Sequence, residues 1–167
     1  MTIVIIGPPA AGKTRIGRRV AHQLDLPFTD TDKQIAAAHG PIPTIFETQG
    51  EPAFREIERA EVVTALAGGG VVSVGGGAVL NRATQLDLDG CLVVLFTVSP
   101  DVVAARLGNS KRPLVPDIDA WRRVVDARRD LYASLADETF DTSHRKADDI
   151  ADDVATWVRS QLAKERV

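Results

Sequence analysis

The chain has 167 residues, which is enough for one domain with a substantial hydrophobic core. Its hydrophobic content of 44%, charged content of 26% and formal net charge of −3 suit a globular protein and argue against a nucleic-acid-binding platform, which needs a basic face. The single cysteine, Cys91, excludes a disulfide framework, and no apolar stretch approaches the roughly 20 residues of a membrane span. We therefore expect a cytoplasmic protein without a signal peptide and with neither nucleic-acid nor membrane partners.

The first element is a β-branched run over residues 2–6 that leads into a loop of small residues, Gly7-Pro8-Pro9-Ala10-Ala11-Gly12-Lys13-Thr14. This layout is typical of a phosphate-binding P-loop, because the glycines let successive backbone N–H groups turn toward an anion. In this motif Lys13 reaches the β- and γ-phosphates of a nucleotide, and the Thr14 hydroxyl can ligate Mg²⁺. An ordinary glycine-rich turn is the alternative, but the whole motif matches in the right context. The candidate nucleotide-binding residues are Gly7, Ala10, Ala11, Gly12, Lys13 and Thr14.

Helical periodicity and turn residues divide the next stretch into short elements. We expect an amphipathic helix from Lys13 to about Asp25, a short strand that carries Asp30, Thr31 and Asp32, and helices over 33–39, around 44–46 and over 51–66. Asp30 and Asp32 would alternate across the strand end, so that one carboxylate can face the Mg²⁺ water shell and the other an acceptor hydroxyl. A solvated acidic turn that caps a helix is the alternative.

Arg55 and Glu58 lie at i,i+3 in the predicted helix over 51–66, so their side chains can pair. Such a pair can be an exposed ion pair that contributes little to stability, and the spacing alone favours this interpretation. It can also be a carboxylate-binding arginine that is held in place by its acidic neighbour. The sequence pattern by itself leaves both interpretations open.

Two glycine triplets, at 68–70 and 75–77, flank a predicted strand over 71–74. Ligands of open α/β sheets bind outside the carboxyl ends of the strands, so Gly75, Gly76 and Gly77 are the functional candidates and the first triplet is expected to be only a turn. Beyond them we expect a strand over 91–98, a helix through Leu107, a polar loop over 108–119, a helix over about 119–135, a strand over 139–142 and a closing helix from about 147. Strands that alternate with helices predict an α/β fold, with a parallel sheet covered by helices on both faces.

These residues resemble, in the same order along the chain, the signature of the shikimate kinases. Besides the P-loop, the resemblance rests on Asp30-x-Asp32, Gly50-Glu51-x-x-Phe54-Arg55-x-x-Glu58, Gly75-Gly76-Gly77, Arg112-Pro113-Leu114 and Arg128-x-x-Leu131-Tyr132. It runs from Ile3 to the final helix. It implies a single P-loop kinase domain over 1–167 with a three-layer fold: a central five-stranded parallel sheet, a mobile lid at about 108–117 and a helical acceptor-binding segment at about 31–60.

The resemblance also implies which residues carry the chemistry. Asp32 would contact the shikimate ring hydroxyls and act as the base. Lys13 would also be catalytic, because it supplies positive charge at the γ-phosphate. Arg112 would move with the lid to contact the phosphates. Asp30 would steady the Mg²⁺ shell beside Thr14.

Further matched positions would bind the two substrates. Arg55 and Arg128 would hold the shikimate carboxylate, with Glu58 orienting Arg55. The triplet Gly75, Gly76 and Gly77 would let the backbone approach the acceptor closely. Arg145 resembles the basic residue that lies along the adenine of ATP.

We therefore interpret the chain as a monomeric shikimate kinase that converts ATP and shikimate, with Mg²⁺, into ADP and shikimate 3-phosphate. A related small-molecule kinase such as a gluconate kinase is the enzymatic alternative, although it should not need two arginines for its acceptor. A catalytically retired nucleotide-binding regulator is the alternative of another class, and the retention of the charged motif residues argues against it. The chain departs from the family at Ala10, where a glycine is usual, and in a short interval between Arg112 and Arg128.

Overall fold

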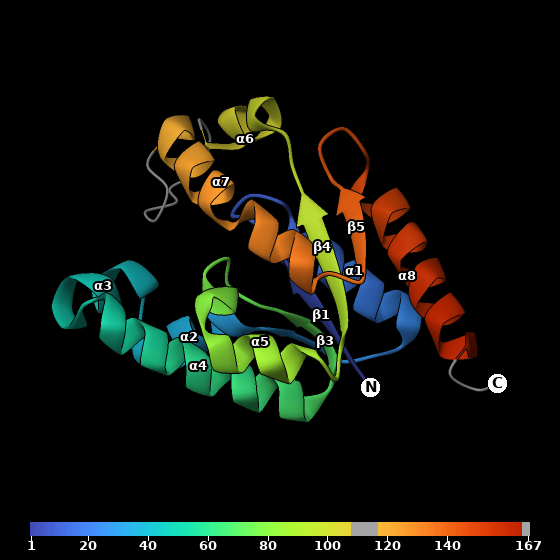
Figure 1. Ribbon diagram of the computed structural model, residues 1–167, viewed down its shortest axis with the longest axis horizontal. Helices are drawn as coiled ribbons and strands as arrows, with labels where there is room; N and C mark the ends of the chain where they lie inside the picture. Colours follow the sequence, from blue (N-terminus) through green and yellow to red (C-terminus); the bar gives the residue numbers. More distant parts are fainter. Residues whose placement is uncertain (108–116, 165–167) are drawn as a thin grey trace.

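A sheet of five parallel strands lies at the centre of the computed structural model, which describes residues 1–107 and 117–164 (Figure 1). The strand order is β2-β3-β1-β4-β5. The strands are β1 (Thr2–Ile6), β2 (Phe28–Asp30), β3 (Gly70–Ser73), β4 (Leu92–Thr97) and β5 (Glu138–Asp141). Residues 3–6 of β1 are fully buried, because both faces of this parallel sheet are covered. The predicted α/β fold with a five-stranded parallel sheet is confirmed.

Alternate residues of β1 pack into two separate hydrophobic clusters, one on each face of the sheet. Ile3 and Ile5 belong to the cluster that includes residues of α1 (Lys13–Leu24), α6 (Pro100–Leu107) and α8 (Ala147–Lys164). Val4 and Ile6 belong to the cluster that includes residues of α4 (Glu51–Gly68), the 3₁₀ turn η1 (Ala78–Leu80) and α5 (Arg82–Leu88). The sheet is therefore the middle of three layers.

Helix α7 (Ile118–Leu135) contributes to both clusters and bridges the two outer layers (Figure 1). Trp121, near its start, packs in the first cluster, and Tyr132, near its end, packs in the second. Both side chains are almost fully buried. Within the described ranges, no helix has both the length and the apolar character that crossing a membrane requires.

Helices α2 (Thr31–His39), α3 (Ile42–Gln49) and the first part of α4 surround a third hydrophobic cluster of their own. Ile35, Ile45 and Phe54 form its buried centre, and the ring centroid of Phe46 lies 4.7 Å from that of Phe54. These helices project to one side of the sheet (Figure 1). They fall within the segment 31–60 that the sequence assigns to the acceptor.

The structure corrects the predicted course of the chain around Asp30. Strand β2 ends at Asp30, and Thr31 and Asp32 form the first turn of α2 instead of continuing the strand. The Asp30 carboxylate accepts a hydrogen bond from the Lys33 N–H at 3.2 Å and so caps α2. The prediction that the two carboxylates alternate across a strand end is wrong.

Other boundaries agree with the sequence to within a few residues, with two additions. The turn η1 and helix α5, which follow the second glycine triplet, were not predicted. The first triplet forms the end of α4 and the start of β3, as the prediction of a turn requires. Of the predicted lid at 108–117, only Asp117 lies within the described residues, and its side chain caps α7.

Candidate active site

The loop from Gly7 to Gly12 joins β1, the central strand, to α1. Gly7 has a φ of 141°, and a β-carbon there would lie 2.3 Å from the Phe96 carbonyl oxygen, so the position requires glycine. Gly12 has a φ of 83° and directly precedes the first residue of α1, Lys13. The Lys13 ammonium donates hydrogen bonds to the carbonyl oxygens of Gly7 at 2.9 Å and Pro8 at 3.0 Å. The chain thus forms the strand–loop–helix layout of a P-loop, with its lysine lying over the loop.

Thr14 and Asp30 bring two side-chain oxygen groups together beside this loop. The Thr14 hydroxyl, in the first turn of α1, donates a hydrogen bond to Oδ2 of Asp30, which is only 8% exposed. Mg²⁺ prefers oxygen ligands and usually takes only one or two carboxylates from the protein when it is bound with phosphates. Residues 1–107 and 117–164 hold no group of three or more His, Cys, Asp or Glu side chains that could bind a metal ion. The pair therefore fits a metal ion that is carried largely by a nucleotide.

Two carboxylates, from α2 and α4, meet at the backbone of Gly75. A β-carbon on Gly75 would lie 2.7 Å from Oδ1 of Asp32 and 2.9 Å from Oε1 of Glu58. Burial raises the pKa of Asp32, and the nearby Lys13 acts in the opposite direction. Burial likewise raises the pKa of Glu58, against the lowering effect of Arg55. A raised pKa makes the Asp32 carboxylate a better proton acceptor than an exposed aspartate, which suits a general base.

Arg55 is held between two acidic residues of its own helix, α4. Its Nη1 lies 2.7 Å from Oε2 of Glu58, and its Nη2 lies 3.2 Å from Oε1 of Glu51. A β-carbon on Gly77 would lie 2.4 Å from Nη1 of Arg55, so this glycine makes room for the guanidinium group. Because Glu58 is only 4% exposed, the pair is not an exposed ion pair but a guanidinium fork fixed by a buried partner.

Helix α7 covers the same glycine triplet. The Tyr132 hydroxyl donates a hydrogen bond to the Gly76 carbonyl oxygen at 2.6 Å. Arg128, one turn earlier on α7, lines the same cavity as Arg55. Two guanidinium groups from different helices therefore border one space, which is the arrangement needed to bind a carboxylate from two directions.

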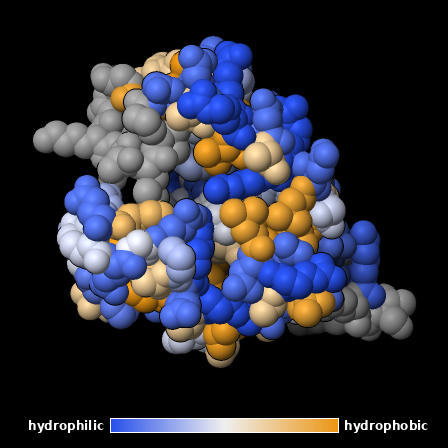
Figure 2. Space-filling view, turned by 60° about the vertical axis from the view of Figure 1, so that its left-hand side comes forward, coloured by the Kyte–Doolittle hydropathy of each residue, from blue (hydrophilic) through white to orange (hydrophobic). Residues whose placement is uncertain are grey.

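The cavity that these elements enclose has a volume of about 620 Å³. Figure 2 shows the molecule hollowed between the projecting lobe of α2 and α3 and the layer that holds α7. The predicted site residues on the cavity wall are Ala10, Gly12, Lys13, Thr14, Asp30, Asp32, Arg55, Glu58, Gly75, Gly76, Gly77 and Arg128.

Three predicted residues within the described ranges are not on that wall. Gly7 and Ala11 are buried within the P-loop itself. Arg145 lies between β5 and α8, where its Nη2 pairs with Oδ2 of Asp153 at 2.7 Å. Arg112 lies outside the described residues.

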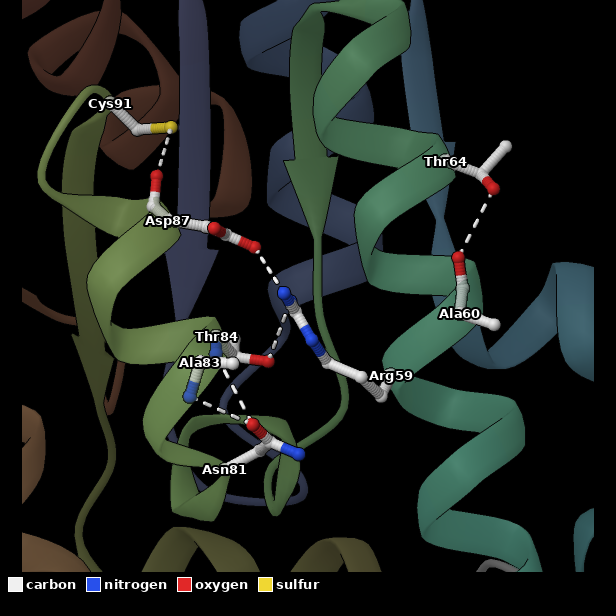
Figure 3. Close-up of polar contacts among 8 residues, drawn as sticks. All are labelled: Arg59, Ala60, Thr64, Asn81, Ala83, Thr84, Asp87 and Cys91. Carbon is white, nitrogen blue, oxygen red and sulfur yellow. Dashed lines mark hydrogen bonds and ion pairs between the residues drawn. The ribbon is translucent and has the colours of Figure 1, made fainter.

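The helix that carries Arg55 and Glu58 is tied to α5 by the next basic residue, Arg59 (Figure 3). Its Nη2 lies 2.6 Å from Oδ2 of Asp87, and its Nη1 donates to the buried Thr84 hydroxyl at 3.2 Å. Asn81 caps α5 by accepting hydrogen bonds from the N–H groups of Ala83 and Thr84. This network fixes α4 against the segment that follows the glycine triplet.

Comparison with known proteins supports the family resemblance that the sequence motifs indicate. The sequence profile described as shikimate kinase matches residues 9–159 of the chain. The chain belongs to the shikimate kinase family. It is 40% identical over 154 residues to the shikimate kinase of Streptomyces avermitilis, and this match covers 89% of the chain and 90% of the relative.

Solved structures agree with membership of the shikimate kinase family. The shikimate kinase from Acinetobacter baumannii, solved in complex with shikimate, superposes with a TM-score of 0.89 at 30% identity, covering 96% of this chain and 93% of the other. A gluconokinase from Sinorhizobium meliloti superposes with a TM-score of 0.66 at 18% identity, covering 98% of this chain and 94% of the other. The second likeness shows a shared fold alone.

The sequence motifs identified twelve of the residues that line the cavity but assigned no role to Tyr132 or Arg59. Tyr132 acts on a backbone carbonyl 56 positions away, and Arg59 acts on a helix that was not predicted. A signal for Tyr132 existed, because it stands in the motif Arg128-x-x-Leu131-Tyr132. A signal for α5 also existed, because Asn81 is a favoured N-cap residue.

Proposed function

We propose that this protein transfers the γ-phosphoryl group of ATP to a hydroxyl group of shikimate, giving ADP and shikimate 3-phosphate. The observation that carries the proposal is that one cavity brings together a P-loop with its lysine, a half-buried aspartate with a raised pKa and two arginines on different helices. The P-loop and its lysine suit a nucleotide, the aspartate suits an acceptor hydroxyl group, and the two arginines suit a carboxylate on the acceptor. Shikimate carries both of these acceptor groups.

In the proposed reaction the protein positions its substrates and neutralises charge more than it forms bonds. The loop amides and Lys13 bind the phosphates, and positive charge around the γ-phosphoryl group favours the transition state. Asp32 accepts the proton of the attacking hydroxyl group. We also propose, from the family resemblance, that Arg112 adds its charge from a lid over about 108–117.

The acceptor is proposed to bind through its carboxylate. Arg55, fixed by Glu58, and Arg128 hold this group, while Gly75, Gly76 and Gly77 let the ring approach the backbone. Two guanidinium forks match a planar carboxylate better than lysines do. This double charge favours an acceptor that carries a carboxylate, as shikimate, quinate and gluconate all do, over a neutral sugar.

We propose that Thr14 and Asp30 hold Mg²⁺ together with the nucleotide. Mg²⁺ held there would neutralise negative charge on the phosphates. Arg145 is proposed to lie along the adenine, which requires it to exchange its contact with Asp153. We further propose that the protein acts as a monomer in the cytoplasm.

A coupled assay for ADP release, run in parallel with shikimate, quinate and gluconate, tests the proposal. We expect Mg²⁺-dependent turnover with shikimate and little with the other two. Lys13→Ala is the control, and it should abolish turnover because the phosphates lose their lysine. Preferential turnover of gluconate would favour a gluconate kinase-like enzyme. Nucleotide binding without turnover of any acceptor would favour a regulator.

A further inference from the structure

Three successive carbonyl groups of the P-loop accept hydrogen bonds from side chains outside the loop. The indole Nε1 of Trp121, on α7, donates to the Pro9 carbonyl oxygen at 2.8 Å. The guanidinium Nη1 of Arg106, on α6, donates to that of Ala10. The hydroxyl group of Thr142, just after β5, lies 2.8 Å from the Ala11 carbonyl oxygen and 3.0 Å from the Thr97 carbonyl oxygen. Its single hydrogen can be donated to either of these two oxygens. We call Arg106, Trp121 and Thr142 the carbonyl clamp.

The clamp sets the direction of the neighbouring amides. In a planar trans peptide the C=O and the following N–H point in opposite directions. A carbonyl oxygen held by α6, α7 or the end of β5 therefore turns the next N–H away from these elements. The three N–H groups concerned belong to Ala10, Ala11 and Gly12, which are predicted to bind phosphate. Within the loop, the Ala11 N–H makes a long hydrogen bond of 3.4 Å to the Pro8 carbonyl oxygen. Ala10 and Gly12 line the 620 Å³ cavity.

The backbone at Ala10 needs such support. Its φ is 68°, in the left-handed region that residues other than glycine avoid, and among the described residues only Asp25 shares this property. A disfavoured backbone conformation persists only where its surroundings determine it. Two clamp contacts, on the carbonyls of Pro9 and Ala10, lie on either side of the Ala10 α-carbon.

Burial makes the clamp contacts specific and hard to replace. The side chains of Trp121 and Thr142 are 2% and 1% exposed, so solvent has little access to compete for these hydrogen bonds. A buried carbonyl that loses its donor is left without a partner, which is unfavourable. The indole has one N–H and no acceptor, so it acts here only as a donor to Pro9.

We infer that Arg106, Trp121 and Thr142 are positioning residues that hold the P-loop with its amides ready to bind nucleotide, and that Ala10 makes the loop dependent on them. The inference rests on the proposed function only in that nucleotide binds at this loop. It assigns Trp121 a role in nucleotide affinity, beyond packing in the core.

The test is Trp121→Phe, which keeps an aromatic ring and removes the N–H donor. Calorimetric titration with a non-hydrolysable ATP analogue and Mg²⁺ should give an affinity about two- to tenfold weaker, the range expected for one lost hydrogen bond. The affinity for shikimate should stay at the wild-type value. Trp157→Phe, on α8, is the matched control, because Trp157 packs against the same core cluster and none of the three clamp contacts comes from it.

A second variant separates positioning from general packing. Ala10→Gly removes the penalty of the positive φ, so Trp121→Phe should weaken nucleotide binding less in an Ala10→Gly background than in the wild type. Thr142→Val removes a second clamp donor at nearly constant shape, and it should also weaken nucleotide but not shikimate binding. Thr142→Val serves as the decisive variant if Trp121→Phe does not fold.

Several outcomes would overturn the inference. Nucleotide affinity in Trp121→Phe equal to that of Trp157→Phe would reduce Trp121 to a packing residue. An equal loss in the wild-type and Ala10→Gly backgrounds would show that the clamp does not support the left-handed residue. These results are distinct from failure of the proposed function, in which the wild-type protein binds nucleotide but does not phosphorylate shikimate.

Discussion

Asp32 lies where burial and charge act on one carboxylate in opposite directions. Burial raises its pKa, Asp30 adds to this effect, and Lys13 and Arg55 lower the pKa. The net effect raises the pKa of Asp32. Ionisation of this carboxyl group is therefore less favourable in the folded protein than in the unfolded chain, and the ionised group destabilises the fold. A residue that weakens the fold when ionised and borders the reaction cavity is typical of a functional site.

Asp32→Asn is therefore expected to lower turnover and to raise the melting temperature. Turnover should fall about 10²–10⁴-fold, as when a general base is removed, while nucleotide affinity stays nearly unchanged. The stability contribution of a carboxyl group with a raised folded pKa is present at low pH and is lost as the pH rises through that pKa. The advantage of the asparagine variant in melting temperature should therefore grow with pH.

Steady-state kinetics and thermal unfolding at several pH values check this prediction. Asp89→Asn, an exposed aspartate between α5 and β4, is the control and should change neither quantity. Near-normal turnover of Asp32→Asn would remove Asp32 from the mechanism. A lower melting temperature at neutral pH would show that the carboxylate is held mainly by its attraction to Lys13.

Residues that act through side chains of distinctive type could be predicted from the sequence. Lys13, Asp32, Arg55 and Arg128 occupy motif positions, and the structure places all four on one cavity. Trp121 could not be assigned in this way, because its partner is a backbone carbonyl 112 positions away and every residue has such a carbonyl. A long-range contact to the backbone that lies outside a known motif or a helix cap leaves no pattern of residue types in a single sequence.

At the scale of elements, the position of α4 decides where Arg55 and Glu58 point. Arg59, one turn beyond Arg55, joins α4 to α5 through Asp87 and Thr84 (Figure 3). Asp87 is 42% exposed, so its ion pair with Arg59 contributes little to stability. The bond to Thr84 is the stronger restraint, because Thr84 is 1% exposed and its hydroxyl depends on Arg59.

Arg59→Met is expected to lower the free energy of unfolding by about 1–2 kcal/mol, because it leaves the buried Thr84 hydroxyl without its donor. The methionine keeps most of the apolar stem, so packing changes little. Asp87→Asn, which removes only the charge of the partner, should lower it by less than about 1 kcal/mol. Urea unfolding of the three proteins measures both values. Equal losses in the two variants would show that the half-exposed ion pair, and not the Thr84 bond, holds the helices together.

The sequence predicted the long elements and failed at short ones. The continuous β-branched run of β1 and the amphipathic faces of α1 and α8 are strong signals in the sequence, and these elements lie where we expected them. A seven-residue helix such as α5 spans too few turns to show a period. Asp30 misled us because the end of a strand and the N-cap of a helix fall on the same residue, and an alternating Asp-x-Asp pattern suits a strand as well as a cap.

At the scale of the whole molecule, the buried hydrophobic residues form two large clusters and one small cluster. Two clusters lie against the sheet and share β1, whereas the third, centred on Ile35, Ile45 and Phe54, lies outside it. Helix α4 joins this third cluster to the rest, because Phe54 belongs to it and Val62 belongs to a sheet cluster. A small cluster that lies outside the sheet is expected to open more easily than the sheet.

Ile45→Ala should therefore speed amide hydrogen exchange in α2, α3 and the first turns of α4, and leave exchange in β1 and β4 almost unchanged. The substitution removes a fully buried side chain from the third cluster alone, so its effect should stay within that local unfolding unit. Val94→Ala in β4 is the control, and it should speed exchange throughout, because Val94 belongs to a sheet cluster.

The same Ile45→Ala protein should lose affinity for shikimate more than for nucleotide, because α2 and α4 carry Asp32 and Arg55, while the P-loop lies between β1 and α1. Exchange that rises equally across the sheet in both variants would show that the three clusters unfold as one, and that the acceptor side of the cavity has no stability of its own.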